Sequence, residues 1–257
     1  MKEILVTNDD GYEAEGLLEL IKALKKIAKV TVVAPATHKS GASHSITITK
    51  PLKFVRVDDD FYKLDDATPS DCIYLGIHAL FKETLPDLVI SGINHGANLA
   101  EDITYSGTCG GAMEGTLQGV ASLSISQLYI ADSLEKYGFD LACEVALPLI
   151  EKILNGGFPL QKREFLNLNL PAVSKAQYRG LKVAPAGTKF YPNEAMINKD
   201  PRGNEYYWLG KSTMNYDPKI NKGSDLEAVF NGYASLTPIM LDMTSHHSLK
   251  GLKEWID

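Results

Sequence analysis

The sequence predicts an α/β fold with a mostly parallel central sheet, and two patterns support this. Short apolar runs at residues 4–6 and 30–33 flank a segment, residues 17–27, in which leucine and isoleucine recur at helical spacing. A strand, a helix and a strand of this length form a βαβ unit, whose two strands are parallel. The alternation of apolar runs and helical patterns returns from residue 69 onward, so we expect the same sheet to continue.

Between these two parts the chain leaves the parallel pattern. Residues 37–45 are rich in Ser, Gly, Ala and His, which indicates a loop beyond the second strand. Residues 45–49 and 53–57 then alternate between apolar and polar side chains, as half-buried antiparallel strands do. We therefore expect an antiparallel excursion here.

The β/α alternation then runs to residue 170. Pro69 opens a helical pattern that reaches Leu80, and residues 88–90 predict a strand that leads into a long polar loop at residues 91–108. The other elements expected in this part are a helix at residues 109–120, a strand at 123–125, a helix at 134–154 and a strand at 165–170.

The C-terminal part is less regular. Tyrosines and a tryptophan lie among polar residues and turn signals from about residue 188 to residue 222, so we expect an irregular extension there. Beyond it the pattern predicts a helix at residues 225–231, a strand at 233–241 and a closing helix at 249–256. Without an internal repeat, the simplest organisation is one α/β domain over residues 1–257.

Composition excludes several classes of protein. Hydrophobic residues make up 44% of the 257 residues and charged residues 23%, which is typical of globular proteins. A net charge of −6 disfavours a nucleic-acid polymer or an anionic membrane as a partner. Three cysteines without CxxC spacing, no export signal and no apolar run of about 20 residues predict a cytoplasmic protein.

Two adjacent carboxylates, Asp9 and Asp10, follow the first strand, where open parallel sheets bind ligands. A dinucleotide-binding domain would carry a GxGxxG turn there, so that amides meet a phosphate. Because neighbouring carboxylates repel each other and any phosphate, this position favours a hard divalent cation. The alternative is that residues 8–11 form only a turn and a helix cap.

A second polar segment, residues 105–112, leads into the expected helix with the sequence YSGTCGGA. Free amides at a helix N-terminus, beside hydroxyls and glycines, suit an anion such as phosphate, although an unliganded cap accounts for the same residues. Together with the carboxylate pair this segment suits hydrolysis of a phosphate ester. A nucleophilic role for Cys109 is disfavoured, because Glu114 stands where Cys-x5-Arg phosphatases carry arginine.

Several segments of the chain carry a family resemblance. They are ILVTNDDG at residues 4–11, VAP and SGAS at 33–35 and 40–43, ATPSDC at 67–72, SGIN at 91–94 with Gly96 and Asn98, YSGT and MEG at 105–108 and 113–115, and GYASLTP at 232–238. On these segments the chain resembles the SurE family of stationary-phase survival proteins, which are metal-dependent 5'/3'-nucleotidases. Two positions depart from the family pattern: Ala100 stands where glycine is usual, and Cys109 where valine is common.

The resemblance implies a Rossmann-like three-layer α/β sandwich whose C-terminal extension serves assembly into a homodimer or homotetramer. It implies one divalent ion per subunit, Mg²⁺ or Mn²⁺, held by Asp9, Asp10, Ser40 and Asn94. It also implies phosphate contacts by Asn98, Ser106, Gly107 and Thr108.

The predicted function is hydrolysis of nucleoside 5'-monophosphates, and of 3'-monophosphates, to nucleoside and phosphate. Asp9 and Asp10 are the expected catalytic residues, since both anchor the metal. The sequence leaves open which of them accepts the proton of the attacking water, and Asp9 is favoured over Asp10. Two alternatives stay open: hydrolysis of short polyphosphate, and a sensor that binds a nucleotide or a metal without catalysis.

Overall fold

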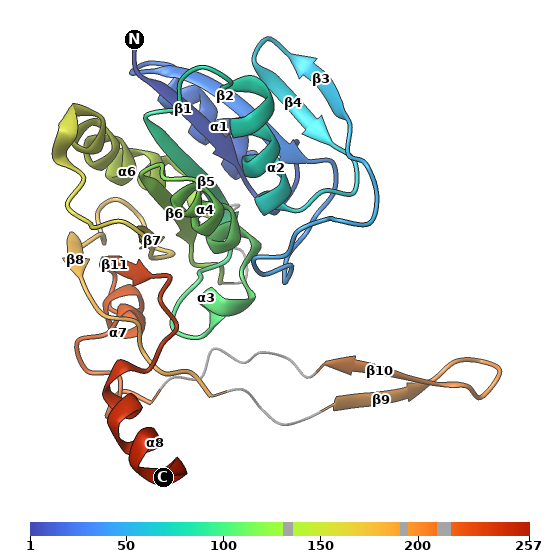
Figure 1. The fold of residues 1–257 in the computed structure, drawn as a ribbon, viewed down its shortest axis with the longest axis vertical. Helices are drawn as coiled ribbons and strands as arrows, with labels where there is room; N and C mark the ends of the chain where they lie inside the picture. The colour runs from blue at the N-terminus through green and yellow to red at the C-terminus, as the bar shows by residue number, and fades with distance from the viewer. Residues whose placement is uncertain (131–135, 191–194, 210–216) are drawn as a thin grey trace.

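The computed structural model describes residues 1–257 except 131–135, 191–194 and 210–216, and it is built on a nine-stranded sheet (Figure 1). The strand order is β3-β4-β2-β1-β5-β6-β7-β11-β8, and the strands from β4 to β7 are all parallel. The predicted α/β fold with a mostly parallel sheet is confirmed.

The N-terminal βαβ unit forms as the pattern predicts. Strand β1 (Glu3–Thr7), helix α1 (Glu15–Leu24) and strand β2 (Lys29–Pro35) follow one another, and β1 pairs in parallel with β2 and with β5 (Leu88–His95). Ile4 and Val6 pack into one hydrophobic cluster and Leu5 into another, because successive side chains of a strand point to opposite faces. Both faces of the sheet are therefore covered.

Helices α1 and α6 (Asp140–Lys152) cover one face of the sheet, and α2 (Pro69–Leu75) and α4 (Gly107–Leu117) cover the other. This gives the three layers that the family resemblance implies. Helix α2 continues into a π-helical turn, η1 (Gly76–Leu80), and its start is fixed by a capping box between Thr68 and Asp71. None of the described helices is long and apolar enough to cross a bilayer.

The antiparallel excursion exists, but one of its two predicted strands is wrong. Strand β3 (Phe54–Asp58) pairs with β4 (Phe61–Leu64), whereas residues 45–49 form no strand. The backbone there is bound by side chains instead: Asp71 accepts from the Thr47 amide at 2.8 Å, and the Thr68 hydroxyl donates to the Ser45 carbonyl at 2.7 Å. These contacts replace a strand ladder.

Beyond β5 the chain forms a short helix, α3 (Asp102–Tyr105), then α4 and strand β6 (Ser122–Gln127). The polar loop expected at residues 91–108 is therefore wrong at both ends. Strand β5 runs on to His95, helix α3 lies within the expected loop, and α4 begins at Gly107, two residues before the predicted start at residue 109. Helix α6 confirms the helical pattern predicted for residues 134–154, whose first two residues lie outside the described part, and it ends in the π-helical turn η2 (Ile153–Gly157).

The C-terminal strands extend the sheet at one edge. Strand β7 (Glu164–Leu170) pairs antiparallel with β11 (Ala234–Met240), which pairs in parallel with the short β8 (Leu181–Val183). Helix α7 (Asp225–Phe230) confirms the predicted helix before β11, and the turn η3 (His246–Ser248) leads into the closing helix α8 (Leu249–Ile256).

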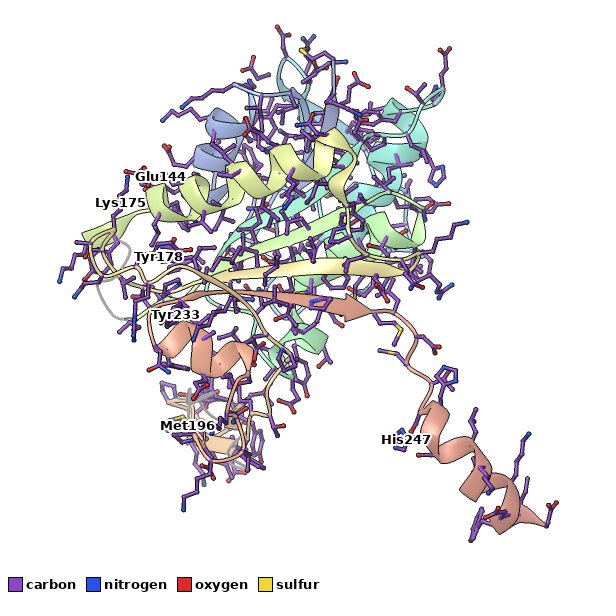
Figure 2. The ribbon with its side chains drawn as sticks, turned by 90° about the vertical axis from the view of Figure 1, so that its left-hand side faces the viewer. Glu144, Lys175, Tyr178, Met196, Tyr233 and His247 are labelled. Carbon is purple, nitrogen blue, oxygen red and sulfur yellow. The ribbon has the colours of Figure 1, made fainter. Side chains whose placement is uncertain are left out.

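The extension expected to be irregular contains an antiparallel hairpin of β9 (Ala195–Lys199) and β10 (Glu205–Leu209), which projects away from the sheet (Figure 1). Helix α8 also leads away from it (Figure 2). Both elements are exposed over their whole length, and they carry Trp208, 64% exposed, and Trp255, 80% exposed. The sequence indicates a turn at this place but not the two strands beside it. Gly203 has a φ of +89°, which allows the tight turn that joins them.

Candidate active site

The candidate site lies at the carboxyl ends of β1 and β5. Strand β1 pairs with β2 on one side and with β5 on the other, so the chain changes direction across the sheet between these strands. Open α/β sheets bind ligands at such a switch point. The loop after β2 joins the same place, since the Lys39 amide donates to the Asp9 carbonyl at 2.6 Å.

Asp9 is buried, with both carboxylate oxygens held by Thr108. The Thr108 hydroxyl donates to Oδ1 at 2.6 Å and the Thr108 amide to Oδ2 at 3.1 Å. Burial raises the pKa of Asp9 to about 6; the Thr108 bonds lower it and the neighbouring Asp10 carboxylate raises it further. A cation beside Asp9 would counteract this rise.

Asp10 and Ser40 are brought together through His38. The Asp10 Oδ2 accepts from the His95 amide at 2.8 Å, while its Oδ1 lies 3.2 Å from His38 Nε2. The same His38 nitrogen lies 3.1 Å from the Ser40 hydroxyl. The structure therefore brings together Asp10 and Ser40, both predicted as metal ligands. For His38 the sequence suggests either an outer or substrate contact or a solvated loop residue, and the structure places it between the two.

Asn94 has an unpaired side-chain oxygen and directly precedes His95, whose amide binds Asp10. It lies in β5 rather than in a loop, after a register shift between Ser91 and Asn94 that re-aims the strand. Its side-chain amide donates to the Gly96 carbonyl at 2.7 Å, whereas its buried Oδ1 has no hydrogen-bond partner among the described residues. Buried acceptors without a partner are rare, so a ligand is expected at this oxygen.

A cation of the hard, oxygen-binding type fits this donor set. The candidates are two carboxylates, one amide oxygen and one hydroxyl, the ligands that Mg²⁺ and Mn²⁺ prefer. In the described part of the chain no three His, Cys, Asp or Glu side chains gather in a metal-binding arrangement. Neutral oxygens such as Asn94 Oδ1 must therefore complete any coordination here.

Helix α4 begins directly against Asp9. A Cβ added to Gly107 would lie 2.9 Å from the Asp9 Cβ and 3.2 Å from the Lys39 carbonyl oxygen, so only glycine permits this approach. Ser106 is the N-cap, and its hydroxyl accepts from the Cys109 amide at 3.0 Å. The predicted anion-binding helix start is thus adjacent to the carboxylate pair.

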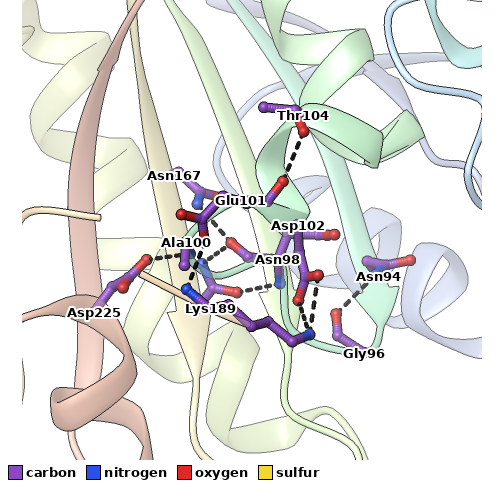
Figure 3. A network of polar contacts seen from close by, with 11 residues as sticks. Asn94, Gly96, Asn98, Ala100, Glu101, Asp102, Thr104, Asn167, Lys189 and Asp225 are labelled. Carbon is purple, nitrogen blue, oxygen red and sulfur yellow. Dashed lines mark hydrogen bonds and ion pairs between the residues drawn. The ribbon is translucent and has the colours of Figure 1, made fainter. Parts of the chain in front are cut away.

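Asn98 is fixed by two asparagines that the sequence reasoning missed (Figure 3). Its amide donates to Asn169 Oδ1 at 2.7 Å, and its carbonyl accepts from the side chains of Asn167 at 2.9 Å and Asn169 at 3.1 Å. Its own side-chain amide donates to Ser126 Oγ at 2.7 Å. The signal was present: after Glu164, asparagines alternate with leucines along a strand whose remaining side chains are apolar.

Cys109 is unsuited to nucleophilic attack. The side chain is completely buried, and burial raises the pKa of its thiol to about 12. The reactive form of cysteine is the thiolate, which this environment suppresses. The structure agrees with the prediction that the attacking group is not a thiolate.

The family model of Survival protein SurE matches residues 4–193. The chain belongs to the SurE family. It is 62% identical to the 5'-nucleotidase SurE of Campylobacter fetus subsp. fetus and 57% identical to that of Campylobacter hominis, with 99% or more of each chain covered. The solved SurE protein from Aquifex aeolicus is 40% identical and superposes with a TM-score of 0.85, over 99% of this chain and 100% of that one.

These SurE relatives confirm the family prediction, the Rossmann-like fold and the enzyme prediction, a 5'-nucleotidase. The family match extends from residue 4 to residue 193, and so every predicted site residue lies inside it. Three points remain predictions made from the sequence of this SurE protein: the roles of those residues, the identity of the metal and the state of assembly.

Proposed function

We propose that this protein is a divalent-metal-dependent phosphomonoesterase that hydrolyses nucleoside 5'-monophosphates, and also 3'-monophosphates. The observation that carries this proposal is that Asp9 packs against the start of helix α4, while Asp10 binds the amide of His95, which follows Asn94 and its unpaired oxygen. The pair and the amide oxygen suit a cation, and the helix start suits the phosphate that the cation accompanies.

Asp9, Asp10, Ser40 and Asn94 hold one Mg²⁺ or Mn²⁺ in this proposal. When bound, such an ion polarises a phosphoryl oxygen and lowers the pKa of a coordinated water. The contacts of Thr108 and of the His95 amide keep the two carboxylates oriented, since such outer contacts fix the ligands of a metal site.

The remaining residues bind and orient the phosphate. The hydroxyl of Ser106 and the Gly107 amide at the start of α4 donate toward the phosphoryl oxygens, where negative charge builds up in the transition state. Asn98 and Gly107 shape the same surface. Asp9 accepts the proton of the attacking water, because Thr108 holds this carboxylate in a fixed orientation.

A cavity of about 350 Å³ beside Asp10 provides room for the nucleoside. Its lining includes Asp10, His38, His95 and Phe139. The exposed His95 ring meets the Tyr129 ring edge to face, with 4.5 Å between their centroids, and Tyr129 is 45% exposed. Exposed aromatic faces stack on nucleobases, which favours a nucleotide over a plain phosphate ester.

Kinetics with AMP and with ribose 5-phosphate, which lacks the base, test this proposal. Turnover of AMP should stop after exhaustive chelation and return with Mn²⁺ or Mg²⁺. The Asp10→Asn variant should need a higher Mn²⁺ concentration for half-maximal activity. The Tyr129→Ala variant should have a higher KM for AMP and an unchanged KM for ribose 5-phosphate. Full activity in the presence of chelator contradicts the proposed metal dependence. Binding of AMP without release of phosphate indicates a sensor, and faster turnover of short polyphosphate than of AMP indicates an exopolyphosphatase.

The proposal includes assembly into a homodimer or homotetramer through the C-terminal extension. Hairpin β9–β10 exposes Met196, Ile197 and Trp208, and helix α8 exposes Leu252 and Trp255. A second copy of the chain would remove this apolar area from water. Light scattering on the parent and on Trp208→Ser measures the state of assembly, and a monomeric parent contradicts it.

A further inference from the structure

A buried network ties the segment between Asn98 and Ser106 to the C-terminal part of the chain (Figure 3). Asp225 Oδ2 accepts from the Ala100 amide at 3.0 Å, and its Oδ1 accepts from the Gly187 amide at 2.8 Å. Glu101 Oε2 accepts from the Lys189 amide at 2.6 Å. Two stretches more than 80 residues apart in the sequence are therefore held side by side.

Lys189 makes the charged contact of this network. Its Nζ lies 2.7 Å from Asp102 Oδ2 and 3.0 Å from Oδ1, so one ammonium group bridges both carboxylate oxygens. The Lys189 side chain is only 4% exposed and that of Asp102 21%, so water competes little for this pair. Removing one partner of such a pair takes this contact from the other charge in a poorly hydrated position, which is costly.

Helix α3 connects this pair to the predicted phosphate-binding residues. Asp102 is the first residue of this four-residue helix, and Tyr105, its last, directly precedes the N-cap Ser106. A helix of one turn has little stability of its own, so contacts from outside determine where it lies. Asn98 is fixed by the strand asparagines, and Asp225 and Lys189 bind residues 100–102 in the middle of the segment. Its far end is also bound by Ser43, whose hydroxyl donates to the Thr104 carbonyl at 2.7 Å and whose amide donates to the Tyr105 carbonyl at 3.0 Å.

From this geometry we propose that Lys189 is a positioning residue for the phosphate-binding segment Asn98–Thr108, an inference that rests on the proposed function. Lys189 holds Asp102, Asp102 sets the place of α3, and α3 sets the place of Ser106 and of the first amides of α4. Lys189 also precedes hairpin β9–β10 by only a few residues.

Calorimetric titration of inorganic phosphate, with Mn²⁺ present, tests this without requiring turnover. Lys189→Met should weaken phosphate binding about ten- to a hundredfold, the size expected when a remote change displaces binding groups by about 1 Å. The KM for AMP should rise in parallel, while the Mn²⁺ concentration for half-maximal activity should change much less, because the metal ligands lie on other segments and only Thr108, at the end of this segment, contacts one of them. Lys189→Arg should retain most of the phosphate affinity.

Asp102→Asn keeps the shape of the side chain and removes the same ion pair. This variant therefore tests the same positioning role if Lys189→Met does not fold. It should weaken phosphate binding similarly, and the double variant should be no worse than either single one. The matched control is Lys175→Met, which breaks an exposed pair with Glu144 far from the site (Figure 2) and should change nothing.

Unchanged phosphate affinity in both Lys189→Met and Asp102→Asn, with only a lower melting temperature, overturns the positioning role. Parallel loss of phosphate and Mn²⁺ affinity also overturns it, because that indicates general distortion. A parent protein that binds phosphate but does not hydrolyse AMP contradicts the proposed function alone.

Discussion

Thr108→Val separates two roles that the sequence and the structure assign to the same hydroxyl. The family resemblance implies that Thr108 contacts phosphate, whereas in the structure its hydroxyl donates to Asp9 Oδ1 at 2.6 Å. Valine has nearly the shape of threonine and keeps the backbone amide bond to Oδ2, so the substitution removes a single hydrogen bond. The question is which ligand then binds more weakly.

The expected loss is in metal affinity. A hydrogen bond to a charged group contributes about 1.5–3 kcal/mol, which corresponds to about ten- to a hundredfold in binding. The loss of an outer contact to a metal ligand has the same typical size. Thr108→Val should therefore bind Mn²⁺ about ten- to a hundredfold more weakly, and excess Mn²⁺ should restore most of kcat.

Calorimetric Mn²⁺ titration and AMP kinetics over a range of Mn²⁺ measure both quantities. Thr116→Val is the matched control, since Thr116 is a buried threonine of the same helix whose hydroxyl bonds the Ala112 carbonyl. Unchanged Mn²⁺ affinity, together with a drop in kcat that excess metal does not restore, would refute the assignment to Asp9. Thr108 would then contact the phosphate, as the resemblance implies.

Three further predictions concern single side chains. Cys109→Ser should keep more than a tenth of kcat, because the buried thiol stays protonated; steady-state kinetics on a variant with an unchanged circular-dichroism spectrum check this, and a loss of three orders of magnitude contradicts it. Ser106→Ala should lower kcat about 10²- to 10³-fold at unchanged Mn²⁺ affinity, as expected for one lost oxyanion donor, and should cost about 1 kcal/mol as a lost N-cap. Ala100→Gly should stabilise the fold by about 0.5–1 kcal/mol, because Ala100 has a φ of +52° that glycine adopts freely; thermal denaturation should show a rise of about 2 °C, and a lower melting temperature contradicts the argument.

Short apolar runs and helical periods predicted most of the fold, because strands buried on both faces and amphipathic helices leave a local signal. The errors arise where long-range contacts decide. Apolar and polar side chains alternate along residues 45–49 as in a strand, yet the side chains of Asp71 and Thr68 hydrogen-bond the backbone there. No local sequence pattern indicates these bonds, because their partners lie more than 20 residues away along the chain. Strand β5 was predicted too short because Ser91, Gly92 and Asn94 are typical loop residues, although they lie in a bulged strand.

The candidate site shows the same division. Asp9, Asp10 and Gly107 follow from position and residue type, since carboxylates directly after β1 suit a cation and a glycine at a helix start suits an anion. The outer contacts could not be predicted in this way. Asn167, Asn169 and Lys189 contact residues 98–102 from about 70 or more residues away along the chain, so only the tertiary structure shows what they hold.

The placement of the two tryptophans has a spectroscopic consequence. Trp208 lies on hairpin β9–β10 and Trp255 on helix α8, and the chain contains no other tryptophan. Intrinsic emission excited at the indole band therefore originates in the two projecting elements and not in the sheet that carries the carboxylates. A blue shift reports the covering of those elements, so the same unlabelled sample gives an optical readout of the extension while its chemistry is followed separately by phosphate release.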